Sequence, residues 1–232
     1  MDADAGYQIL DSLLSRLEPT AKLVSGRVVR RLLVRLRDLD GLALLVPHGW
    51  GLAVRSRDAL HHATAQELMV SGQGQIPEWL LLIARPSPGT IASWSEFELY
   101  NWLKGRLVHL AADRAFAQNR PANHEGWLAF GESLDERVWE EVMGVLAEEK
   151  RLIPGAKPWE EREEFLSTAL ELSLVDPDAI QWWFPSVDPK TIDSLLWRHS
   201  FLEGPRELAL RLDGLRVPVP DLPVTSPCAA NS

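Results

Sequence analysis

The longest uninterrupted apolar run in the chain is WLLLIA, at residues 79–84. A helix that crosses a bilayer needs about 20 apolar residues, so this run is far too short to span a membrane. It is bounded closely by Pro86, and a short apolar run that ends at a proline is typical of a buried strand. We therefore expect a buried strand at residues 79–85 and no membrane span.

Most of the remaining chain repeats its apolar residues at the helical period. The pattern predicts helices at 7–18, 20–39, 58–70, 94–118, 133–151 and 159–175, with two short helices opening at VDPDAI (175–180) and VDPKTI (187–192). The longest opens on Ser95-x-x-Glu98, a capping-box pattern. Residues 42–57 hold two apolar runs around PHGWG and predict a β-hairpin. We expect a mainly α protein with a small β-hairpin and strand element in its N-terminal part, with α+β as the alternative.

The sequence QNRPANHEG, at residues 118–126, is the best candidate for an internal linker. It divides the chain into two predicted parts. Residues 1–121 contain the small β element and the long helix 94–118, and residues 122–216 form a helical part. The two should pack together, because neither promises a large core alone. Residues 217–232 contain four prolines and predict an extended or disordered tail.

Charge is distributed unevenly along the chain. Residues 1–120 carry 14 basic and 12 acidic side chains, whereas residues 121–232 carry 10 basic and 21 acidic ones, and the net charge is −9. This surplus of acid disfavours nucleic acid as a partner. Arginine outnumbers lysine by 19 to five, which suggests a GC-rich, bacterial coding sequence. The first residues do not resemble a signal peptide, so we expect a cytoplasmic protein.

Motifs for cofactors and metals are missing from the sequence. The only cysteine is Cys228, which excludes an intramolecular disulfide and a multi-cysteine zinc site. SGQGQIP lacks the third glycine and the helix of a dinucleotide fingerprint, and no Walker lysine or Gly-x-Ser-x-Gly elbow occurs. We expect no cofactor and no metal.

The chain contains ten tryptophans but only two tyrosines and six phenylalanines. Tryptophan is enriched at binding hot spots, and Trp182 and Trp183 would point about 100° apart on a helix. Both cannot face one core, so at least one should reach a surface or an interface. We assign Trp182, Trp183 and Phe184 as apolar anchors for a partner; the alternative is that the tryptophans fill ordinary core positions.

The segment RVVRRLLVRLR places arginines opposite its leucines on a helix. Arg27, Arg30, Arg31 and Arg35 could contact an acidic partner, a phosphate or an anionic surface. The alternative is a solvated helix face whose arginines pair with acidic residues elsewhere in the chain.

One polar stripe in the long helix resembles an acid–base site. Arg106, His109 and Asp113 follow one another at helical spacing, so a histidine oriented by an aspartate would lie near an arginine that could hold an anionic group. An exposed polar stripe would give the same spacing. No nucleophile or metal partner can be identified for it.

The leading functional hypothesis is a non-catalytic protein-interaction or regulatory subunit of a cytosolic multiprotein assembly, with homo-oligomerisation possible. It rests on the surplus tryptophan, the segregated charge and the missing catalytic motifs. The first alternative is an enzyme that acts on an anionic small molecule through His109, Asp113 and Arg106, and whose side chains would line a concave pocket. The second is nucleic-acid binding through the arginine-rich helix.

Overall fold

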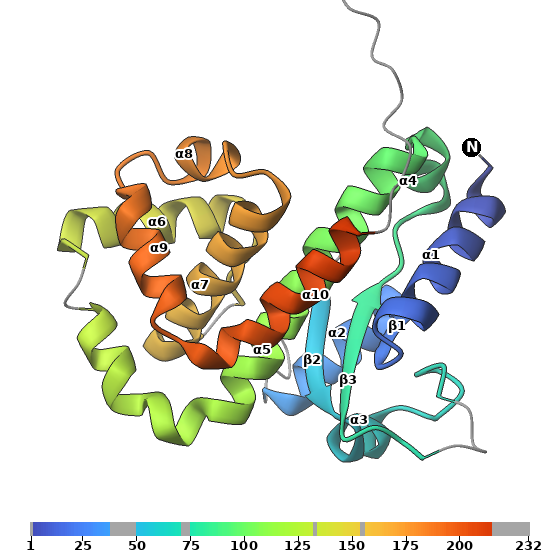
Figure 1. Ribbon diagram of the computed structural model, residues 1–232. Coiled ribbons are helices and arrows are strands. Elements are labelled where there is room, and N and C mark those ends of the chain that lie inside the picture. The colour runs from blue at the N-terminus through green and yellow to red at the C-terminus, as the bar shows by residue number, and fades with distance from the viewer. Residues whose placement is uncertain (1, 38–49, 71–74, 132–133, 154–155, 215–232) are drawn as a thin grey trace, which may run out of the picture.

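A computed structural model describes residues 2–37, 50–70, 75–131, 134–153 and 156–214, with the backbone alone for 120–131. The described residues form ten α-helices, one short 3₁₀ turn and one three-stranded sheet. Figure 1 shows the sheet beside the long helix α5, with α6 to α9 grouped on the other side of that helix. This confirms a mainly α fold with a small β element in the N-terminal part.

The sheet is centred on the predicted buried strand. Its strands are β1 (Ala21–Val24), β2 (Gly51–Arg55) and β3 (Trp79–Ala84), in the order β1-β3-β2. β1 runs parallel to β3, with Leu23 opposite Ile83, and β2 runs antiparallel to it. Every residue of β3 is buried. Helices cover both faces of the sheet, which explains why this strand is apolar throughout rather than alternating.

The two faces of β3 belong to different apolar clusters. Leu80 and Leu82 pack with α2 (Gly26–Leu36) and α3 (Ser56–His62), whereas Leu81 and Ile83 pack with α1 (Ala3–Leu17) and α5 (Glu96–Gly131). Alternate side chains of a strand point to opposite faces, so one short run supports both layers. The sheet is therefore the middle layer of the N-terminal half.

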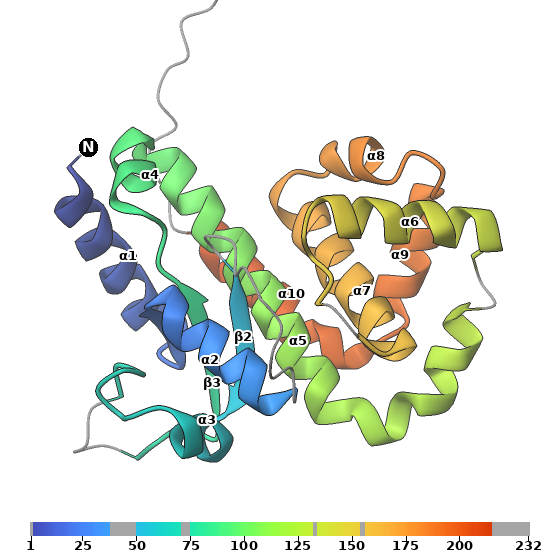
Figure 2. The same ribbon diagram turned by 180° about the vertical axis from the view of Figure 1, so that it is seen from behind.

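The remaining helices extend the larger cluster into the C-terminal half. They are α4 (Pro88–Ser93), α6 (Glu136–Glu148), α7 (Pro158–Val175), α8 (Ala179–Trp183), α9 (Pro189–Trp197) and α10 (Glu203–Asp213), with the 3₁₀ turn η1 (Ser200–Leu202) before α10. α5 contacts the sheet as well as α7 and α10. Seen from behind in Figure 2, α5 lies between the sheet and the group formed by α6 to α9. One apolar cluster runs from Leu10 to Leu212 across this helix.

Polar side chains fix several helix starts. The predicted capping box is confirmed: the Glu98 carboxylate accepts the Ser95 backbone N–H at 2.7 Å, and the Ser95 hydroxyl accepts the Glu98 N–H at 3.2 Å. Asp188 caps α9, whose first residue is Pro189. The first of the two Val-Asp-Pro repeats behaves differently, because Asp176 ends α7 and α8 begins only at Ala179.

Some predicted boundaries were wrong. Residues 21–24 form β1 rather than the start of a helix at 20, because their backbone pairs with β3; the helix begins at Gly26, capped by Ser25. β2 pairs with β3 and not with a hairpin partner, while residues 42–49 lie outside the described residues. The expected linker at 118–126 lies inside α5. The predicted tail 217–232 also lies outside the described residues.

Among the described helices, none combines the length and the apolar character that crossing a bilayer requires.

Candidate functional site

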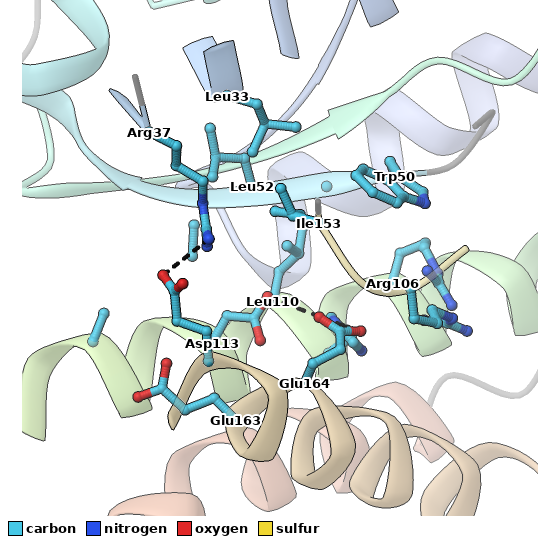
Figure 3. Close-up of a pocket in the computed structure, with 16 residues that line it drawn as sticks. Leu33, Arg37, Trp50, Leu52, Arg106, Leu110, Asp113, Ile153, Glu163 and Glu164 are labelled. Atoms are coloured by element: carbon cyan, nitrogen blue, oxygen red, sulfur yellow. Dashed lines mark ion pairs between the residues drawn. The ribbon is translucent and has the colours of Figure 1, made fainter. Parts of the chain in front are cut away.

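A cavity of about 130 Å³ lies where α5, α7, β2 and the end of α2 meet. Figure 3 shows Leu33, Leu52 and Trp50 on one side of this cavity and Asp113, Glu163 and Glu164 on the other. We call it the acidic cavity. Its lining is completed by Arg37, Gly51, Ala53, Arg106, His109, Leu110, Ala117, Arg151, Ile153 and Glu160.

The polar stripe predicted on the long helix faces this cavity. Arg106, His109 and Asp113 all line it, together with Leu110 from the same face of α5. His109 is buried, and Arg106 and Asp113 are half-buried. The stripe is therefore concave and enclosed rather than a solvated helix face.

Glu171 of α7 is the centre of an ion-pair network behind the cavity. Its carboxylate accepts hydrogen bonds from the guanidinium of Arg106 and from that of Arg151, the latter at 2.9 Å. Burial alone would raise the pKa of Glu171, but Arg106, His109 and Arg151 outweigh it and hold this pKa well below its usual value. Glu171 is therefore ionised, and it neutralises charge that would otherwise be buried alone.

His109 is held as a cation by three carboxylates. Its Nδ1 atom lies 3.1 Å from Oε2 of Glu171, a contact whose direction departs from that of a hydrogen bond, and its Nε2 lies 3.4 Å from Glu164 and 3.6 Å from Asp113. Burial alone would lower its pKa, but Asp113, Glu164 and Glu171 together raise the pKa of His109 to about 10. The imidazole is therefore protonated at neutral pH.

This protonation limits the chemistry that the stripe can perform. A general base needs a pKa near the working pH and an unprotonated nitrogen, and His109 has neither at pH 7. The Ser167 hydroxyl donates to Asp113 at 2.6 Å. Asp113 therefore lies between the serine and the histidine in this chain of contacts. In a catalytic triad the histidine stands between the other two. The arrangement stabilises a buried cation and does not activate Ser167.

Asp113 and Glu164 are more exposed than the two inner arginines of the cavity. The side chains of Asp113 and Glu164 are 29% and 21% exposed, against 15% for Arg106 and 13% for Arg151. Arg37 is about as exposed as Asp113, at 30%, and is paired with Glu160 at 2.9 Å. An incoming ligand therefore meets Asp113, Glu164 and the paired Arg37 before the inner arginines, which are bound to Glu171.

Among the described residues, the ionisable side chains that line the acidic cavity are balanced in number. Four can be cations, namely Arg37, Arg106, Arg151 and protonated His109. Four are carboxyl groups, Asp113, Glu160, Glu163 and Glu164, and Glu171 lies behind the lining. Burial raises the pKa of Asp113, and His109 lowers the pKa of Glu164 below its usual value.

Several residues of the site were not singled out from the sequence. Glu163, Glu164 and Glu171 belong to the acid-rich C-terminal half of the chain, for which no inward-facing acid was predicted, yet Glu163 and Glu171 are buried. Trp50 stood in the PHGWG stretch of the predicted hairpin and Arg151 at the end of the predicted helix 133–151, and neither was assigned a functional role. A helix that carries acid on several faces, as EEREEF does, was the one available indication that some of this acid must face inward.

The three predicted aromatic anchors have separate locations. Trp182 is 85% exposed, whereas Trp183 is half-buried with its ring 5.4 Å from the guanidinium of Arg151. Phe184 is fully buried against Phe165, so it is a core residue and cannot contact a partner. Trp197 resembles Trp182 in being largely exposed, at 69%, and the guanidinium of Arg206 lies over its ring.

The predicted arginine face exists but is partly engaged. Arg27, Arg30, Arg31 and Arg35 are exposed on α2, while the buried residues of that helix are Val28, Val29, Leu32 and Leu33. Arg31 pairs with Glu67 at 2.7 Å. This pair is of the kind that the solvated-face alternative expects.

In the described part of the chain, no group of three or more His, Cys, Asp or Glu side chains is arranged to hold a metal ion. No family model, curated protein or solved structure matches the chain.

Proposed function

We propose that this is a non-catalytic binding protein whose acidic cavity takes a small organic cation, an alkylammonium or a guanidinium. The observation that carries the proposal is the arrangement of charge: the cations around the cavity are bound to carboxylates, and Asp113 and Glu164 are more exposed than the inner arginines Arg106 and Arg151. Buried titratable groups gathered at one cavity are a physical indication of a binding site.

The shape of the cavity is consistent with such a ligand. Trp50 offers an aromatic face, which attracts organic cations, and Leu33, Leu52 and Ile153 can cover a short alkyl chain. One water molecule takes about 30 Å³ in the liquid, so a volume of about 130 Å³ admits only a few heavy atoms. The ligand, or the part of it that enters, is therefore the size of a butylammonium or methylguanidinium ion.

Calorimetric titration of the whole protein tests this proposal with probes of equal size and different charge. We expect n-butylammonium to bind with a Kd of about 1 mM, which is reasonable for so few atoms, and at least about tenfold more tightly than butyrate or butanol. Methylguanidinium should compete with it. Equal binding of butyrate and butylammonium would contradict the proposal, as would no binding of either cation.

A variant that fills the cavity without touching its charges gives a second test. Ala117 lines the cavity from α5 and is half-buried, so Ala117→Leu should reduce butylammonium affinity at least about tenfold. The matched control is Ala147→Leu, at an exposed position of α6 that does not line the cavity. Retained affinity in folded Ala117→Leu would place the ligand elsewhere.

A second candidate function is docking of another protein, and the exposure of Trp182 and Trp197 favours it. Large aromatic side chains in water are unfavourable and are enriched at hot spots. Affinity purification from the native host should recover a stoichiometric partner, and the Trp182→Ala/Trp197→Ala variant should lose it. Recovery of the same partner by the folded variant, or of none by the natural protein, would count against docking at these residues.

A further inference from the structure

A second cavity, of about 370 Å³, opens at the other end of α2 from the acidic cavity. Val24 ends β1 there, Ser25 caps α2, and Arg85 directly follows β3. The carboxyl ends of two neighbouring parallel strands thus meet at its wall, which is where open α/β sheets commonly bind ligands. We call it the basic cavity. Its lining is completed by Leu23, Arg27, Val28, Arg31, Gln66, Glu67 and Met69.

Two of the three arginines in this lining have no carboxylate partner among the described residues. Glu67 is committed to Arg31, at 2.7 Å, and to the backbone N–H of Thr64, at 2.9 Å. The Thr64 hydrogen bond, followed by Arg31, lowers the pKa of Glu67, so this carboxylate is ionised and occupied. Arg27 and Arg85 form no ion pair within the part of the chain that the structure describes.

Arg85 is held in place before any ligand arrives. Its guanidinium lies 5.6 Å from the centre of the Tyr7 ring, and the Tyr7 hydroxyl donates to the carbonyl of Pro86 at 2.7 Å. The Nε atom of Arg85 is buried and forms no hydrogen bond to any described residue. A buried donor without a partner is costly, so the described residues do not fully satisfy the side chain of Arg85.

The start of α2 adds to the positive potential of the same cavity. α2 has eleven residues and no acidic side chain in its first turn, so its partial positive charge is not offset by the helix itself. Ser25 accepts the Arg27 N–H at 3.3 Å. The start of α2, Arg27 and Arg85 therefore all contribute positive potential to the basic cavity.

The wall of the basic cavity also carries an apolar side chain in an unusual conformation. Met69 has a φ of 55° and is half exposed, at 51%. The left-handed region is unfavourable for a residue with a Cβ atom, and such strain is often retained at ligand sites. The thioether beside two uncompensated arginines favours an anion that is attached to an organic group.

We propose that the basic cavity binds a phosphate monoester, with Arg27 and Arg85 holding the phosphate and Met69 contacting the esterified group. The arginine fork matches phosphate oxygens in geometry as well as in charge. This site is separate from the acidic cavity and does not depend on the proposed binding of a cation there.

Titration of the full chain with phenyl phosphate and with inorganic phosphate, followed by ³¹P NMR, tests the proposal. Arg27→Gln and Arg85→Gln should each weaken phenyl phosphate binding at least about tenfold. The matched control is Arg30→Gln, on the same helix and exposed but outside the cavity, and it should change Kd less than about twofold. Arg27 is exposed, so its replacement leaves the fold intact even if Arg85→Gln does not.

The organic half of the proposal has its own test. Met69→Gly relieves the positive φ and removes the thioether, so it should weaken phenyl phosphate while leaving inorganic phosphate unchanged. The proposal is overturned if Arg30→Gln weakens binding as much as Arg27→Gln, because that result indicates diffuse attraction to α2. It is also overturned if neither phenyl phosphate nor inorganic phosphate binds. The same holds if the natural protein and Met69→Gly bind each of the two phosphates with the same affinity.

Discussion

Gly51 of β2 lies directly against Leu110 of α5: a Cβ atom at position 51 would come within 2.6 Å of the leucine Cδ1 atom. The missing side chain therefore sets how closely the sheet approaches the long helix, and both residues line the acidic cavity. Leu110 is itself buried, so a Cβ atom at position 51 would force its side chain to shift within the core or into the cavity.

We expect Gly51→Ala to lower the free energy of unfolding by about 1–3 kcal/mol, the usual cost of overpacking. Gly144 of α6 is the matched control, since a Cβ atom there meets nothing within 4 Å. Gly144→Ala should raise stability by up to about 1 kcal/mol, as expected in a helix interior. Urea denaturation measures both; equal effects of the two substitutions would show that β2 does not depend on this close approach.

Glu171→Gln should be among the most destabilising single changes in the chain. It would leave Arg106 and Arg151 buried without their shared carboxylate, and removing one partner of a buried ion pair costs about 3–5 kcal/mol. Glu140→Gln changes an exposed residue of α6 and should alter stability by less than about 0.5 kcal/mol. A Glu171→Gln variant as stable as Glu140→Gln would mean that the network is not formed in solution.

The pH dependence of stability should report on His109. Its folded pKa, about 10, lies above its ordinary value of 6.5, so the folded state binds the proton more tightly. The stabilisation from protonation is full below pH 6.5 and is lost as the pH rises towards 10. Asp113, Glu164 and Glu171 face the imidazole, with Arg106 and Arg151 behind them.

Chemical denaturation between pH 6.5 and 10 checks this sign. The free energy of unfolding should fall more steeply in the natural protein than in His109→Gln, whereas His61→Gln, at an exposed histidine, should keep the steeper fall. Parallel curves for the natural protein and His109→Gln would show that the histidine is not held as a cation.

Neighbouring aromatic residues should differ sharply in their effect on stability. Phe184 is fully buried between α7 and α8, so Phe184→Ala should cost about 3–5 kcal/mol. Trp182 is 85% exposed, and Trp182→Ala should change stability by no more than about 0.5 kcal/mol. Thermal denaturation of the two variants measures the contrast. A large loss in Trp182→Ala would reveal a contact that the exposed position does not account for.

The sequence predicted those elements in which local pattern and burial agree. WLLLIA was identified as a buried strand because six apolar residues before a proline have few alternatives, and the Ser95 box marked the start of α5 by its own hydrogen bonds. Residues 21–24 were mistaken for helix because their strand pairing comes from β3, nearly 60 residues away. Local periodicity contains no information about such a partner.

The candidate site was predictable only in part for a related reason. Helical spacing alone placed Arg106, His109 and Asp113 on one face, and this face does line a cavity. Their actual partners, Glu164 and Glu171, come from another helix, so the sequence could not show that Arg106 is already neutralised. Protonation of His109, which weakens the acid–base interpretation, follows entirely from those contacts.

The position of α5 also determines how the molecule should lose its structure. Because Leu110 lies against Gly51 of the sheet while Gly105 lies against Glu171 of α7, neither half retains a complete core when the other opens. Native-state hydrogen exchange should therefore give the amides of β3, α5 and α7 the same opening free energy. Despite the contrast in charge between its halves, the chain should unfold as one cooperative unit.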